Sequence, residues 1–221
     1  MTPYHCRYLA TILCTSLLSV SSITIAAPCE QFCHPFYMGI SGGYGSTTWY
    51  GLVPSANKQN MAMSMSTPIH VSEGGAAWGV YAGYEFIPTF ALEASYMRYR
   101  EATVTFDPDS LFSFNNDGMT YLRTNTETVS LMGKVMLIIP NTLIRAYSSA
   151  GIAVEHRWDA ISDHNHGTPT FGLGVNYDAS EHVMTELAAT YTAGYGESEL
   201  EPVKDYMPFL YAVMLRIAYR I

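Results

Sequence analysis

The chain ends in MPFLYAVMLRIAYRI (residues 207–221), and this stretch indicates the fold class. Large apolar residues occupy every second position, while the positions between them hold mostly small, flexible or cationic residues. Because successive side chains of a strand point to opposite faces, the pattern predicts a strand with one wholly apolar face. A helix of the same sequence would scatter these residues around its whole circumference. The apolar positions are Phe209, Tyr211, Val213, Leu215, Ile217, Tyr219 and Ile221.

A strand with so long an apolar face is unusual in a soluble sheet but suits a wall that faces lipid. The whole chain contains 17 tyrosines and 17 glycines, and charged residues make up only 14% of it. This composition is typical of β-structure at a membrane interface. Beyond the N-terminal segment, no stretch approaches the roughly 18 uninterrupted apolar residues of a membrane-spanning helix. We therefore predict an all-β outer-membrane barrel that this last strand closes.

The N-terminal segment predicts export from the cytoplasm. Arg7 precedes a short apolar run, Leu9–Val20, and small residues follow that run. This order is typical of a secretory signal peptide, here residues 1–27, and the run falls short of the ~20 residues that a membrane anchor needs. The prediction leaves a short periplasmic segment, residues 28–35, before a barrel domain over residues 36–221.

Charge and cysteine content narrow the classes of partner. The formal net charge of −8 becomes about −9 without the signal peptide. This balance argues against nucleic acid as a partner, because phosphate binding needs a basic face. Two cysteines remain in the exported chain, Cys29 and Cys33. Their short spacing in an oxidising compartment favours a local disulfide over a metal site, which would need further ligands.

Eight segments of the exported chain alternate large apolar residues with small or polar ones. Their connections are in turn long and short, as in an antiparallel up-and-down barrel with short periplasmic turns and long extracellular loops. Such a barrel has no free strand edge, which lipid requires. The expected long loops are about residues 47–72, 100–122, 157–168 and 194–206. The expected strands are residues 36–46, 76–86, 90–97, 128–137, 144–155, 171–178, 183–192 and 207–221.

The second set of alternating positions carries glycines and charges of both signs, so we expect it to line a narrow lumen. A soluble, lipocalin-like barrel is the alternative, with its apolar positions pointing inward. Aromatic residues towards the strand ends of the apolar set resemble interfacial girdles and favour the lipid-facing interpretation. Because buried charges have to be paired, we interpret the lumen charges as a salt-bridged plug rather than a gated ion path. The predicted lumen charge network is Glu85, Glu93, Lys134, Arg145, Glu155, Glu186 and Arg216.

Five segments, in their order and spacing, resemble the small outer-membrane barrels of the OmpA-like and opacity-protein-like group. The resemblance implies a barrel surrounded by outer-membrane lipid and lipopolysaccharide, and assembled by the barrel-assembly machinery through its C-terminal strand. One departure is Ile221, because the family usually ends in Phe, and we expect no peptidoglycan-binding domain after the barrel. The segments are FYMGISGGYG (36–45), WGVYAGYEF (78–86), ALEASYMRY (91–99), FGLGVNYD (171–178) and YAVMLRIAYRI (211–221).

The long loops are the predicted working surface. We expect a surface-structural role, with loops for adhesion or for contact with a host protein or a ligand. Aromatic and methionine side chains of the first loop suit adaptable contacts, and the last loop is acidic. These residues are Trp49, Tyr50, Met61, Met63 and Met65 in the first loop, and Glu197, Glu199, Glu201 and Asp205 in the last.

Three alternatives remain open. A narrow ion-conducting pore would use the lumen charges. A lipid-A-modifying or esterase-type enzyme would need a nucleophile, a histidine and an acid held together, and the nearest set is His70, Ser72 and Glu73, which no motif frames. A metal site in the third long loop lacks a fixed geometry, so we expect no metal, no cofactor and no enzymatic activity. Its potential ligands are His156, Asp159, Asp163, His164 and His166.

Overall fold

The computed structural model describes residues 34–53, 68–195, 203 and 206–221. Several sequence-based predictions lie outside these residues. They concern the signal peptide, the disulfide between Cys29 and Cys33, the methionines of the first long loop and the acidic residues of the last. None of the described helices is long and apolar enough to cross a membrane.

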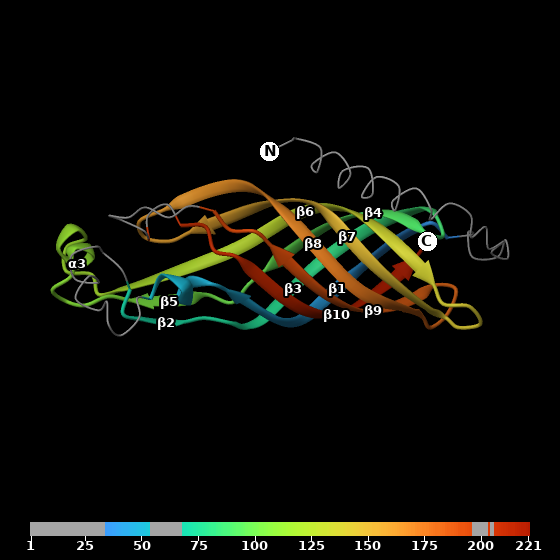
Figure 1. Cartoon of the computed structure of the whole chain (residues 1–221), viewed down its shortest axis with the longest axis horizontal. Helices are drawn as coiled ribbons and strands as arrows, with labels where there is room; N and C mark the ends of the chain where they lie inside the picture. Colours follow the sequence, from blue (N-terminus) through green and yellow to red (C-terminus); the bar gives the residue numbers. More distant parts are fainter. Residues whose placement is uncertain (1–33, 54–67, 196–202, 204–205) are drawn as a thin grey trace, which may run out of the picture. The chain divides into compact units, whose positions relative to one another are not determined.

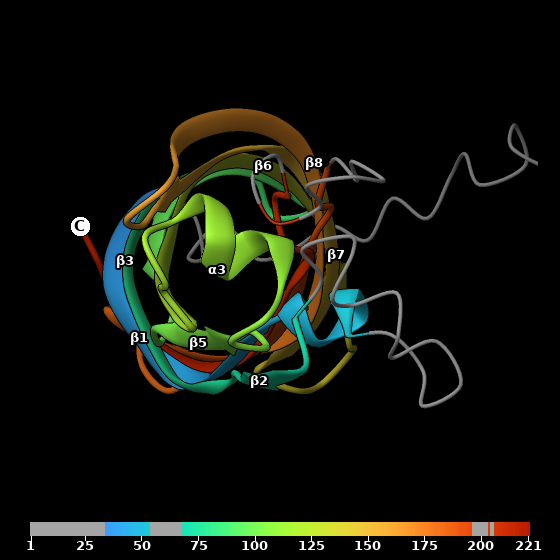
Figure 2. The same ribbon diagram turned by 90° about the vertical axis from the view of Figure 1, so that its left-hand side faces the viewer.

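Eight long strands form a closed antiparallel ring (Figures 1 and 2). Each strand pairs with the next along the chain, and the last, β10, pairs with the first, β1. In the closing pair, Tyr37 lies opposite Arg220 and Thr47 lies opposite Leu210. The ring confirms the predicted barrel. Its strands are β1 (Phe36–Thr47), β3 (Gly75–Ile87), β4 (Phe90–Arg98), β6 (Tyr121–Ile138), β7 (Ile144–Trp158), β8 (Asp163–Asp178), β9 (Val183–Thr192) and β10 (Leu210–Arg220).

The apolar positions of the strands point outward, which confirms the predicted orientation. On β10, Leu215 is 61% exposed whereas its neighbour Met214 is 1% exposed. Exposed apolar side chains on β6 run from Val129 to Leu137, and those on β7 end at Val154. Because a lipid-facing wall has to be apolar, this belt marks the membrane-spanning part of the strands.

Two tyrosines cross the lumen, and each lies over a glycine of the neighbouring strand. Tyr37 is opposite Gly83, and Tyr147 is opposite Gly174. A Cβ atom on Gly83 would lie 2.3 Å from the Tyr37 ring, and one on Gly174 would lie 2.5 Å from the Tyr147 hydroxyl oxygen. Glycine at these positions therefore gives large rings room inside a barrel of only eight strands.

The first two long loops contain regular structure that the sequence did not predict. The first holds the short helix η2 (Trp49–Leu52) and strand β2 (His70–Ser72), and the second holds strand β5 (Ala102–Thr105) and helix α3 (Leu111–Asn115). Strand β5 pairs with the first four residues of β6, residues 121–124, and β2 pairs with β5, so a small sheet projects beyond the ring (Figure 1). We call these elements together the rim extension.

The rim extension has an apolar core of its own. Trp49, expected on an exposed loop, is completely buried there, whereas its neighbour Tyr50 is 65% exposed. The rings of Phe106 and Phe112 stack with their centroids 3.7 Å apart. The prediction of Trp49 as a contact residue is therefore wrong, because its ring fills the interior of the extension. The core residues are Trp49, Leu52, Val71, Ala102, Val104, Phe106, Phe112, Leu122, Val203 and Tyr206.

The third long loop, predicted over residues 157–168, is a short turn. Strand β7 continues to Trp158, which pairs with Asp163 at the start of β8, so residues 159–162 alone connect the two strands. These strand ends project beyond the lipid-facing belt, where neither face has to be apolar. The alternation that marks the other strands is consequently missing here.

Candidate functional site

Four charged side chains from four strands meet in the lumen. Glu93 on β4 and Glu186 on β9 lie between Lys134 on β6 and Arg216 on β10. Lys134 Nζ is 3.1 Å from Glu93 Oε2 and 3.0 Å from Glu186 Oε2. Arg216 Nη2 is 2.6 Å from Glu93 Oε1, and Arg216 also pairs with Glu186. Each carboxylate thus contacts both cations, and we call this neutral set the central quartet.

Tyrosine hydroxyls add hydrogen bonds to both carboxylates of the central quartet. Tyr37 donates to Glu93 Oε2 over 3.0 Å, and Tyr147 donates to Glu186. Both tyrosines and both glutamates are buried. Because an ion removed from water costs several kcal/mol, these additional donors help to stabilise the buried charges.

Aromatic rings also lie against both cations of the central quartet. Lys134 Nζ is 4.0 Å from the centroid of the Tyr147 ring, and the Arg216 guanidinium carbon is 3.6 Å from that of Tyr81. Cation–π contacts of this kind gain strength when water is excluded. Lys134 and Arg216 are therefore stabilised both by the two carboxylates and by the aromatic rings that pack on them.

A second neutral quartet lies at the strand ends next to the short turns. Arg145 Nη2 is 3.1 Å from Glu85 Oε1, and Arg145 Nε is 3.3 Å from Asp178 Oδ2. Arg220 Nη2 is 2.8 Å from Glu85 Oε1 and 3.2 Å from Asp178 Oδ1. We call these four residues the turn-side quartet.

The sequence analysis missed Asp178 and Arg220. A signal was present, because Arg220 follows Arg216 by four residues and Asp178 follows Asn176 by two, which puts them on the lumen-facing set of their strands. Charges at strand ends are, however, easily taken for solvated rim residues. Only the ring closure shows that the two strand ends face each other across the lumen.

Six of the seven residues of the predicted lumen charge network belong to the two quartets. The seventh, Glu155, is also buried, but its carboxylate lies in the opposite half of the lumen and has no hydrogen-bond partner among the described residues. Two successive neutral quartets in a lumen that side chains already fill leave no evident route for an ion. The arrangement therefore favours the plug interpretation over the gated path.

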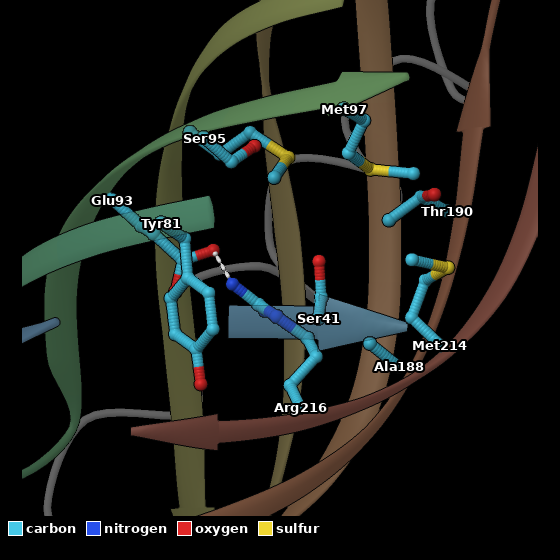
Figure 3. A pocket seen from close by; sticks show the side chains of 10 residues that line it. Ser41, Tyr81, Glu93, Ser95, Met97, Ala188, Thr190, Met214 and Arg216 are labelled. Atoms are coloured by element: carbon cyan, nitrogen blue, oxygen red, sulfur yellow. Dashed lines mark hydrogen bonds and ion pairs between the residues drawn. The ribbon is translucent and has the colours of Figure 1, made fainter. Parts of the chain in front are cut away.

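A small cavity of about 20 Å³ lies against the central quartet (Figure 3). Glu93 and Arg216 border it, and three methionines on β6, β10 and the end of β4 contribute flexible thioethers. Methionine adapts to irregular gaps, so we interpret this cavity as a packing gap of the lumen. The methionines are Met97, Met132 and Met214.

The histidines and aspartates of the third long loop do not converge. His156 Nδ1 lies 3.1 Å from Glu127 Oε1, and its Nε2 lies 3.0 Å from Asp163 Oδ1. His166 instead stacks on Tyr195. Within the described part of the chain, no group of three or more His, Cys, Asp or Glu side chains is arranged to hold a metal ion.

Two hydrogen bonds raise the pKa of His156 above its ordinary value. The bond with Glu127 is the larger cause, and the bond with Asp163 acts in the same direction. The pKa of Glu127 is correspondingly lowered, chiefly because the Tyr96 hydroxyl donates to it over 2.7 Å and secondarily because of His156. This cluster lies on the outer wall beyond the lipid-facing belt.

The set of His70, Ser72 and Glu73 is not arranged as a nucleophile with its base and acid. The Glu73 carboxylate accepts hydrogen bonds from the backbone N–H groups of Trp49, over 2.6 Å, and Tyr50, over 3.4 Å. Its role is therefore to hold η2 against β2 and β3. Burial raises the pKa of Glu73, and these two N–H donors oppose that shift.

The closed ring, the apolar outer belt and the lumen lined with charged residues define the class of this protein. It is an eight-stranded outer-membrane β-barrel. Residues 34–221 match the model of the OmpA-like transmembrane domain, and the chain belongs to that family. The short turns accordingly face the periplasm, and the rim extension is extracellular.

Solved structures of bacterial outer-membrane proteins share the fold. The outer membrane protein OprG from Pseudomonas aeruginosa is similar with a TM-score of 0.52 and 11% identity, over 85% of this chain and 96% of that chain. Neisserial surface protein A is similar with a TM-score of 0.51 and 12% identity, over 84% of this chain and 97% of that chain. No curated protein sequence matches the chain. At these identities the likeness concerns the fold alone.

We expect the replacement Lys134→Met to lower the free energy of unfolding by about 3–5 kcal/mol, because Glu93 and Glu186 would keep only Arg216 as a counter-charge. The matched control is Arg123→Ala, which removes an exposed ion pair with Glu101 of 3.8 Å and should change that free energy by less than about 0.5 kcal/mol. Urea unfolding in detergent micelles measures both. Equal effects of the two replacements would contradict a stabilising central quartet.

We expect the protonation of His156 to make a smaller, pH-dependent contribution to the free energy of unfolding. The folded-state pKa of His156 is raised above the unfolded value near 6.5. Its contribution to the free energy of unfolding is therefore complete below about pH 6.5 and is lost as pH rises through the folded pKa. For a partly exposed pair the loss should be below about 1 kcal/mol. Urea unfolding of wild type and His156→Gln between about pH 5.5 and 8.5 tests this. A difference between the two proteins that does not shrink with rising pH would refute it.

Proposed function

We propose that this barrel is a surface protein whose extracellular rim extension makes adhesive contact with proteins on a host or a neighbouring cell. The observation that carries the proposal is that the extension is folded around its own apolar core and yet leaves Phe114 of α3 86% exposed. Binding residues commonly lie on loops that a rigid scaffold positions.

The local sequence of α3 explains why one phenylalanine is buried and the other exposed. The Ser110 side chain caps the helix by accepting from the Ser113 N–H over 3.2 Å. Phe112 then packs on Phe106 inside the extension, while Phe114, two residues further along a helix, points away from it. The helix lies at the far end of the extension (Figure 1).

An exposed aromatic side chain on a preformed surface suits protein recognition. Large aromatic residues are common among the few that dominate binding energy at interfaces. A surface that is already ordered also loses less conformational entropy when a partner binds. Leu111, which is 36% exposed on the same helix, extends the apolar contact.

Other partners follow from the class of protein. The lipid-facing belt would contact outer-membrane lipid and lipopolysaccharide. The barrel-assembly machinery would bind the C-terminal strand β10, which is followed by Ile221 instead of the Phe usual in the family. Contact with lipid and lipopolysaccharide and recognition by the assembly machinery are proposed together with the adhesive role.

We expect Phe114→Ser to reduce adherence of bacteria that display the protein to an epithelial monolayer by about tenfold, the effect of losing a central aromatic contact. Ile139→Ser is the control, because Ile139 is an exposed apolar residue of a periplasmic turn and should leave adherence unchanged. Surface display and the gel mobility of unheated protein have to match in all three strains. Adherence that survives the loss of Phe114 would refute the contact.

A narrow pore is the principal alternative, and the two quartets argue against it. We expect the refolded wild-type barrel to show no steady single-channel openings in a planar bilayer, because both quartets would have to separate to let an ion pass. The gel mobility of the unheated protein controls for folding. Steady, reproducible openings would favour the pore and make the quartet residues determinants of ion selectivity.

A further inference from the structure

Glu155 is the buried charge that the two quartets do not explain. Its side chain points into the lumen from β7, it is completely buried, and neither carboxylate oxygen has a hydrogen-bond partner in the described part of the chain. The Arg157 guanidinium interacts electrostatically with this carboxylate but does not hydrogen-bond to it. A buried carboxylate without hydrogen-bond donors is strongly unfavourable. An unsatisfied polar group of this kind calls for a bound species that satisfies it.

Unpartnered hydroxyl groups lie near Glu155 on the neighbouring strands. Thr128 on β6 and His166 on β8 lie directly opposite it in the two strand pairs. Thr126 and Thr168 are the diagonal neighbours on the same inward face, within the reach that such positions have. The hydroxyl oxygens of both diagonal threonines are buried and, like the carboxylate, bond to none of the described residues.

More hydroxyls of this kind line the extracellular half of the lumen. Thr124 on β6 and Thr47 on β1 are also buried and lack a hydrogen-bond partner among the residues that the structure describes. By contrast, Thr170 and Thr192 bond to each other with their oxygens 3.0 Å apart. These four threonine oxygens, of Thr47, Thr124, Thr126 and Thr168, therefore lie in the same half of the lumen as the Glu155 carboxylate.

The nearest cation on the same face of β7 already has partners. Arg157 Nη2 lies 2.6 Å from Asp159 Oδ2, and Arg157 Nη1 donates to the backbone oxygens of Val203 and Tyr206 over 2.8 and 2.6 Å. Its guanidinium also lies 4.6 Å from the centroid of the Trp49 ring. Arg157 thus stabilises the base of the rim extension, and Asp159 balances its charge.

We propose that Glu155 and the hydroxyls of Thr126 and Thr168 bind a single sodium ion inside the extracellular half of the barrel. The ligands are all oxygen atoms, which hard cations prefer. One carboxylate among neutral hydroxyls carries one negative charge, so a monovalent cation leaves the site neutral, whereas a divalent ion would leave an uncompensated positive charge in the lumen. Histidine and thioether groups, which softer metals favour, do not supply the unpartnered atoms.

The site would couple sodium to the stability of the barrel. An ion that binds only the folded state lowers the unfolding equilibrium constant by the factor 1 + [Na⁺]/Kd. Above Kd, that constant should fall about tenfold for each tenfold rise in sodium, which corresponds to one ion per chain. Potassium and choline at the same ionic strength should have a much smaller effect.

The test is urea unfolding of the full refolded barrel in micelles, followed by tryptophan fluorescence in sodium, potassium or choline chloride. Wild type should show the tenfold dependence on sodium, and Glu155→Gln should abolish it while raising stability in choline. The control Glu127→Gln changes an outward-facing carboxylate that already has partners and should keep the sodium dependence.

A second variant and a direct measurement distinguish sodium binding from an indirect effect of removing the carboxylate. Thr168→Val keeps the shape of the side chain but removes one ligand, so it should weaken the apparent sodium affinity several-fold. The matched control Thr170→Val should leave the apparent sodium affinity unchanged. Broadening of the sodium-23 resonance by wild type should be lost in Glu155→Gln.

Three results would overturn the proposal. An equal response of wild type to choline would show a general salt effect, and an equal response to potassium would exclude sodium as the specific occupant. Unchanged stability of Glu155→Gln in every salt would show that the carboxyl group carries a proton and needs no cation.

Discussion

The pairing of β10 with β1 determines what the remaining parts of the molecule can do. Within lipid no water is present to bond with free backbone N–H and C=O groups, so an open sheet edge is not tolerated. The register from Tyr37 with Arg220 to Thr47 with Leu210 closes the ring without leaving such an edge. Closure also decides which side chains share the lumen, because it brings the first and last strands together.

Closure with only eight strands makes the lumen a crowded, dry space. The glycines opposite Tyr37 and Tyr147 give these rings room, and their hydroxyls in turn bind Glu93 and Glu186. Charges in such a space are stable only in neutral, hydrogen-bonded sets. The central and turn-side quartets meet this requirement. Glu155 stands out because neither of its carboxylate oxygens has a hydrogen-bond partner among the described residues.

The extracellular side follows different rules from the barrel wall. Beyond the lipid-facing belt, strand faces are no longer required to alternate, and β7 and β8 pair there through polar residues such as His156 and Asn165. The rim extension is stabilised by contacts between segments distant in sequence, such as Trp49 with Tyr206 at a centroid distance of 5.0 Å. A strand of four residues such as β5 and a helix of five such as α3 leave too short a periodic signal to be recognised.

The amino-acid sequence alone was enough to predict the barrel, its strand number, the orientation of its two faces and most of the charges in its lumen. This was possible because lipid imposes a two-residue period on every spanning strand, and that period is visible locally. The three-dimensional arrangement was needed to show how the charges divide into two quartets, that Asp178 and Arg220 complete one of them, that Trp49 is buried and that Glu155 is left apart. These outcomes depend on distances across the lumen and between loops, which ring closure sets and no local pattern records.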